Sequence, residues 1–148
     1  EDSDFERNSV VGASAKGGAI WADASASVTV IDTEVKENRV AGTSAQGGAV
    51  YNAGVLTLTS TVVEDNRAIG RNGGSSQGGG IFNVGDMTLV ETEIEENRAV
   101  GKDGQGGGIY NLGTASVDEE SEIKRNKASA SNDDVFGDLD LLDQLLAV

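Results

Sequence analysis

The chain has 148 residues, a formal net charge of −14 and 21 glycines, but no proline, cysteine or histidine. Its length suits one domain with a continuous core. Without cysteine and histidine, disulfides and histidine-based catalytic triads are excluded, and only oxygen atoms are left as metal ligands. The negative charge argues against nucleic acid as a partner, and no stretch approaches the roughly 20 apolar residues that span a membrane.

A sequence repeat of about 30 residues runs through the chain. A glycine-rich motif followed by an aromatic residue recurs as GGAIW, GGAVY, GGGIF and GGGIY at 17–21, 47–51, 78–82 and 106–110. A second motif is centred on an asparagine, and its copies are spaced by 30, 28, 31 and 29 residues. These asparagines are Asn8, Asn38, Asn66, Asn97 and Asn126.

Short segments with strand character fill each repeat. Residues 55–59 read VLTLT, and residues 27–30 and 86–89 are their counterparts. Glycine pairs and β-branched runs disfavour helices, whereas stacked coils would place equivalent residues ~4.8 Å apart on neighbouring strands. The sequence therefore predicts an all-β fold, a right-handed parallel β-helix of about four to five coils over residues 1–137.

The asparagine column is predicted to be structural. Apolar residues occur three positions before and two positions after each asparagine, and this five-residue separation breaks strict alternation. A corner is therefore expected just before the asparagine. Because a side-chain amide both donates and accepts, stacked copies could satisfy one another as a ladder at the inside of the corner.

The aromatic column has two interpretations. If the aliphatic residue of each glycine-rich motif points inward, the next residue points outward, and the column forms an exposed stripe that binds a protein partner or a glycan. Alternatively, the phase is reversed or neighbouring loops cover the rings. The residues of this candidate binding stripe are Trp21, Tyr51, Phe82, Tyr110 and Phe136.

Residues 138–148 break the repeat. Leucines at helical spacing predict a short amphipathic helix that caps the last coil, because solenoid ends need cover. The alternative is a docking segment for another protein. The residues concerned are Leu139, Leu142, Leu145 and Leu146.

Other candidate sites are weaker. The acidic stretches 91–96 and 118–122 lack the Gly-Gly-x-Gly-x-Asp repeat of calcium-binding β-rolls, so no metal, cofactor or catalytic residue is predicted. Two threonine columns invite an ice-binding interpretation, which irregular coil lengths disfavour. They are Thr29, Thr57 and Thr88, and Thr33, Thr61 and Thr92. An acidic column (Glu37, Asp65, Glu96) beside a basic one (Arg39, Arg67, Arg98, Lys127) is interpreted as cross-paired charges on a solvated face.

The glycine-rich motifs with their spaced asparagines resemble repeats of polymorphic outer-membrane proteins and autotransporter adhesins, over residues 5 to about 137. The resemblance implies a pectin-lyase-like right-handed β-helix and a secreted or cell-surface adhesive role.

Three functions are considered. The first is a non-catalytic structural or binding module, extracellular or on a cell surface. The second is a small soluble accessory subunit of a larger assembly, in an organelle lumen, held through its open N-terminal coil and its C-terminal tail. The third is a carbohydrate-active enzyme.

Overall fold

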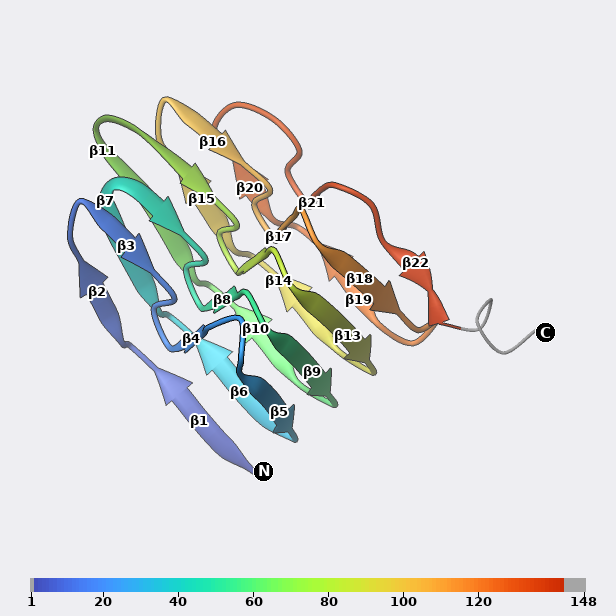
Figure 1. Cartoon of the computed structure of the whole chain (residues 1–148). Helices are drawn as coiled ribbons and strands as arrows, with labels where there is room; N and C mark the ends of the chain where they lie inside the picture. Colours follow the sequence, from blue (N-terminus) through green and yellow to red (C-terminus); the bar gives the residue numbers. More distant parts are fainter. Residues whose placement is uncertain (1, 143–148) are drawn as a thin grey trace.

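The computed structural model describes residues 2–142, which form five coils of a parallel β-solenoid (Figure 1). Each coil passes through four sheets in turn, and equivalent strands of successive coils pair in parallel. No α-helix occurs within the described residues. The predicted solenoid fold is therefore confirmed.

The first two sheets lie one after the other along each coil. Sheet A contains β1 (Ser3–Glu6), β6 (Thr33–Lys36), β10 (Val62–Glu64), β14 (Glu93–Glu95) and β19 (Glu122–Lys124). Sheet B contains β2 (Ser9–Val11), β3 (Ser14–Lys16), β7 (Arg39–Gln46), β11 (Arg67–Gln77), β15 (Arg98–Val100), β16 (Asp103–Gln105) and β20 (Lys127–Ala128).

The other two sheets complete each coil. Sheet C contains β4 (Ile20–Ala22), β8 (Val50–Asn52), β12 (Ile81–Asn83), β17 (Ile109–Asn111) and β21 (Val135–Phe136). Sheet D contains β5 (Ser27–Ile31), β9 (Val55–Thr59), β13 (Asp86–Val90), β18 (Thr114–Val117) and β22 (Asp140–Leu141).

The main core lies between sheets A, C and D. It consists of aliphatic columns, in which Val35, Val63 and Ile94 of sheet A belong to the same cluster as Leu58 and Leu89 of sheet D. Equivalent residues occupy the same place in every coil, so the core is continuous along the solenoid axis.

Sheet B forms an arm that leaves this core and returns to it (Figure 1). The arm has a thin core of small residues, in which Val40 and Ala68 pack with Ala45. Its return ends at the glycine pairs. Gly47 has a φ of 64°, and a Cβ on Gly48 would lie 2.7 Å from the backbone nitrogen of Arg67. The glycine motif is therefore required by the narrow neck of the arm.

The five asparagines stack as a ladder at the junction of sheets A and B. The backbone N–H and the Nδ2 of Asn8, Asn38, Asn66 and Asn97 each donate to Oδ1 of the asparagine in the next coil, at 2.8–3.0 Å. Nδ2 of the later four donates further, to a backbone carbonyl of the preceding coil. Those carbonyls belong to Phe5, Val35, Val63 and Ile94.

The corner lies one residue before each ladder asparagine, where the chain adopts the left-handed conformation. The φ angles there lie between 53° and 57°. The residues are Arg7, Glu37, Asp65, Glu96 and Arg125. All are polar and outside the core, and the asparagine that follows turns inward to satisfy the bent backbone.

A second amide ladder joins sheets C and D. Nδ2 of Asn52 donates to Oδ1 of Asn83 at 2.7 Å, and Nδ2 of Asn83 donates to Oδ1 of Asn111 at 2.7 Å. All three side chains are buried. The sequence shows these asparagines at the repeat period, but their ladder was not predicted.

The predicted C-terminal helix is wrong for the described part of residues 138–148. Leu139 packs against the main core, and Asp140–Leu141 form β22, which pairs with β18. Leu142 is half-buried, and Leu145 and Leu146 lie outside the described residues. The open edge of β18 offers a full set of backbone partners, whereas an eleven-residue helix is marginal by itself.

The ladder predicts a position-dependent effect of one substitution. Asn66→Leu removes the acceptor of two buried donors on Asn38, and each group left unsatisfied costs about 1–3 kcal/mol. We expect Asn66→Leu to lower the free energy of unfolding by at least about 3 kcal/mol, and Asn8→Leu at the exposed end by less than about 1 kcal/mol. Urea unfolding followed by circular dichroism measures both, and equal losses would contradict a buried ladder.

Candidate functional site

The aromatic column is mostly buried, so the predicted exposed stripe is wrong for three of its five residues. Tyr51, Phe82 and Tyr110 are 9%, 3% and 7% exposed, and Phe136 is half-buried. The four rings stack nearly parallel, with centroids 5.2, 5.3 and 4.3 Å apart. The rings thus point away from the aliphatic core, yet they form a second apolar cluster of their own.

Trp21 is the exception and is 59% exposed. Its backbone is in register with Tyr51, but the Lys16 ammonium lies 4.2 Å from the Tyr51 ring centroid and donates to its hydroxyl at 3.1 Å. Because Phe82 stacks on one face of that ring, Lys16 occupies the other face. The stack therefore ends at Tyr51, and the indole lies outside it.

Burial of the rings predicts opposite outcomes for two truncations. Phe82→Ala should lower the free energy of unfolding by about 3–5 kcal/mol, because it opens a cavity between two stacked rings. Trp21→Ala should change it by less than about 1 kcal/mol. Thermal and urea unfolding measure the difference, and a neutral Phe82→Ala would show that the column is not packed.

Charge is strongly segregated over the surface. Five equivalent segments, 2–7, 32–37, 60–65, 91–96 and 118–125, contain sixteen of the 25 carboxylates but four of the 11 basic residues. They form sheet A and its two corners, and we call their outer surface the acidic face. Two columns of residues in register run along this face. One is Glu34, Val62, Glu93 and Glu122, and the other is Lys36, Glu64, Glu95 and Lys124.

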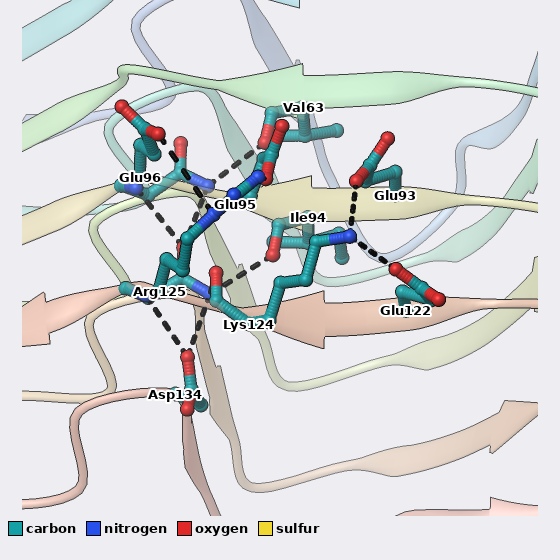
Figure 2. Close-up of polar contacts among 11 residues, drawn as sticks. Val63, Glu93, Ile94, Glu95, Glu96, Glu122, Lys124, Arg125 and Asp134 are labelled. Carbon is teal, nitrogen blue, oxygen red and sulfur yellow. Dashed lines mark hydrogen bonds and ion pairs between the residues drawn. The ribbon is translucent and has the colours of Figure 1, made fainter.

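The four basic residues of the acidic face gather at its two ends. At the last coil, Lys124 lies between Glu93, at 2.8 Å, and Glu122, while Arg125 pairs with Glu95 (Figure 2). The hydrogen bonds from Lys124 to Glu122 and Glu93 raise the pKa of its ammonium above the ordinary lysine value.

A similar group of ion pairs lies at the first two coils. Arg7 pairs with Glu37 at 2.8 Å and with Glu6 at 2.9 Å, and Lys36 pairs with Glu34. Both ends of the acidic face are therefore partly neutralised.

The middle of the acidic face has no such compensation. Glu64, Asp65 and Glu91 form no ion pair with any residue of 2–142. Glu91 accepts a hydrogen bond from the Ser60 hydroxyl at 3.0 Å. Val62, half-buried, lies among these carboxylates. The centre of the face thus combines uncompensated negative charge with one small apolar spot.

A basic stripe lies on the outgoing strands of the arm. Arg39, Arg67, Arg98 and Lys127 are in register on adjacent strands. Lys127 pairs with Asp133 at 2.8 Å, but the three arginines pair with no carboxylate of the described residues. The predicted cross-pairing with the acidic column is therefore wrong. The left-handed residue at each corner interrupts the alternation that would place side chains two positions apart on one face.

A shallow hollow separates the two charge columns. Its volume is about 400 Å³, and it is lined by Glu37, Asn38, Arg39, Asp65 and Arg67. Carboxylates and guanidinium groups therefore face the same space without touching. The surface carries both signs of charge at this junction and becomes predominantly acidic towards sheet A.

An aspartate ends the asparagine ladder at the last coil (Figure 2). Oδ1 of Asp134 accepts from the backbone N–H of Asn126 at 2.9 Å and from its Nδ2 at 3.0 Å. The carboxylate stands in for the amide oxygen that a further coil would supply. Sequence reasoning missed this role, because the residue occurs once and outside the repeat.

Several other site types find no support within residues 2–142. No group of three or more carboxylates is placed to hold a metal ion, and no helix has the length and apolar character to cross a membrane. Thr33, Thr61 and Thr92 are buried and donate to the carbonyl two residues earlier, so this column cannot form an ice-binding surface.

Comparisons of the chain with models of protein families, with curated proteins and with solved structures find no match. The structure itself defines the chain as a parallel β-solenoid of about five turns. Its resemblance to polymorphic outer-membrane and adhesin repeats rests on the sequence motifs alone.

Proposed function

We propose that the chain is a non-catalytic structural and binding module whose acidic face docks a cationic partner. The observation that carries the proposal is the uncompensated centre of that face, at Glu64, Asp65 and Glu91. The partner that fits is a protein surface or segment rich in lysine and arginine.

Electrostatic repulsion within the face supports this function. Like charges on directly opposed positions of neighbouring strands destabilise a sheet. Glu64 is in register with Glu95 on one side and with Lys36, which pairs with Glu34, on the other. A cationic partner would relieve this repulsion, and the apolar stem of a lysine or arginine could pack on Val62. The face is thus less stable alone than in a complex.

The basic stripe supports orientation of the partner. Arg39, Arg67 and Arg98 lie two residues beyond the acidic corner column and would repel a cationic surface. Opposite fields on adjoining faces steer a charged partner onto one of them and fix its direction. Docking is therefore confined to sheet A and its corners.

The resemblance of the repeat motifs implies an adhesive role and an extracellular or cell-surface location, and we include both in this proposal. An accessory subunit of a larger assembly is the alternative. In both of these functions the chain would bind its partner through an exposed surface and not in a cleft.

A binding experiment with an octalysine peptide tests the proposal. The test variant carries Glu64→Gln, Asp65→Asn and Glu91→Gln. The control carries Asp86→Asn, Asp138→Asn and Asp140→Asn, three exposed carboxylates outside the acidic face, so both variants have the same net charge. Since exposed ion pairs contribute ~0.2–1 kcal/mol each, we expect the test variant to bind about tenfold more weakly and the control to bind nearly as the parent.

Isothermal titration calorimetry at low ionic strength gives the three affinities. Equal weakening in both variants would show that net charge alone attracts the peptide, and the acidic face would then not be the docking surface. Circular dichroism of each variant establishes that the fold is unchanged.

A further inference from the structure

The arm of the third coil is longer than the arms on either side of it. Its strand β11 has 11 residues, whereas β7 has eight, and the register between them shifts between Gly70 and Ser75. Towards the next coil, β11 pairs with β15 as far as Ile69 and with β16 from Ser75 onwards. Residues 71–74 therefore lie outside the strand pairing with both neighbouring coils.

This unpaired tip contains the one Asn-Gly pair of the chain, Asn72 and Gly73. The Asn72 side chain is exposed, and it borders a shallow opening of about 190 Å³ together with Arg71. A Cβ placed on Gly73 would meet no atom within 4 Å, so no neighbour packs against the glycine on that side. Water therefore reaches the pair, and packing does not oppose a local change of its backbone.

An asparagine followed by glycine can lose its side-chain amide without an enzyme. The backbone nitrogen of the glycine attacks Cγ of the asparagine, and the new bond closes a five-membered succinimide. The Cγ–Nδ2 bond breaks, ammonia leaves, and the proton of the glycine N–H passes to water. Water then opens the ring at one of its two carbonyls and gives aspartate or isoaspartate. Glycine favours the attack because it has no Cβ to obstruct it.

We propose that Asn72 is a site of spontaneous deamidation in the folded chain. The product has a new carboxylate next to Arg71, on the arm that carries the basic stripe, and lowers the charge of this arm by one unit. Isoaspartate also lengthens the main chain by one atom, which the tip accommodates because residues 71–74 have no register to keep. This proposal is independent of the acidic face.

Other asparagines of the chain serve as internal comparisons. Asn83 and Asn97 are fully buried, and their amides donate to the ladder asparagine of the next coil. Asn132 matches Asn72 more closely, because it is exposed and has a φ of 60° beside 55° for Asn72. However, Asp133 follows it, so the comparison isolates the effect of the glycine.

Incubation of the folded chain at mildly alkaline pH, followed by peptide mapping with mass spectrometry, tests the proposal. Alkaline pH accelerates the reaction because the attacking N–H must lose its proton. Trypsin cleaves after Arg71 and Arg98, and residues 72–98 then carry Asn72, Asn83 and Asn97 in one peptide. The control variant is Asn72→Gln, whose longer side chain would have to close a six-membered ring. A synthetic peptide of residues 67–77 gives the rate without the fold.

We expect Asn72 to yield two products of equal mass, aspartate and isoaspartate, while Asn83, Asn97 and Asn132 keep their amides. The Asn72→Gln variant should yield neither product, and the synthetic peptide should react at a rate similar to that of the folded chain. If the peptide reacts and the folded chain does not, the arm holds the Asn72 side chain away from Gly73, and the proposal is overturned. Loss of the Asn132 amide as fast as that of Asn72 would equally overturn it, because the glycine would then have no effect.

Discussion

Backbone pairing between successive coils is the constraint on which the structure depends. Each strand must hydrogen-bond to its equivalent about 30 residues later, so a residue type chosen once recurs as a column with ~4.8 Å spacing. Aliphatic columns then fill the core without leaving any buried side-chain polar group unpaired. A buried polar column is tolerated only if its members satisfy one another, and an amide can do so because it donates and accepts. The asparagine ladders are this solution at two corners of the coil.

The same constraint acts on charge. Columns of carboxylates on sheet A bring like charges into register, which opposes stacking. Arg7 and Lys36 at one end, and Lys124 and Arg125 at the other, offset part of this repulsion, while the third coil keeps its carboxylates unpaired. The surface thus keeps repulsion between like charges in the third coil, and a bound cationic partner would offset this repulsion. A scaffold with fixed column spacing holds that pattern rigidly.

Features repeated in every coil could be predicted from the sequence, and features that occur once could not. The period located the asparagine column and the corner before it, and the glycine pairs marked a turn that a side chain would block. The second ladder followed the same period, but Ala22 replaces its first member, and that gap hid it. Burial of Tyr51 and Phe82 could not be deduced from alternation, because the rings are covered by one another and not by the main core. Asp134 had no periodic signal.

Hydrogen exchange of the side-chain amides, followed by NMR, measures whether the buried asparagine ladder holds the coils together. The Nδ2 protons of Asn66 and Asn97 should exchange only when the whole solenoid unfolds, because both side chains are fully buried and bonded to the coils on either side. Asn72, exposed where the register of β11 shifts between Gly70 and Ser75, is the internal control and should exchange at the rate of a free amide. Exchange of Asn66 as fast as that of Asn72 would show that the ladder opens freely, and such a ladder could not hold the coils in register.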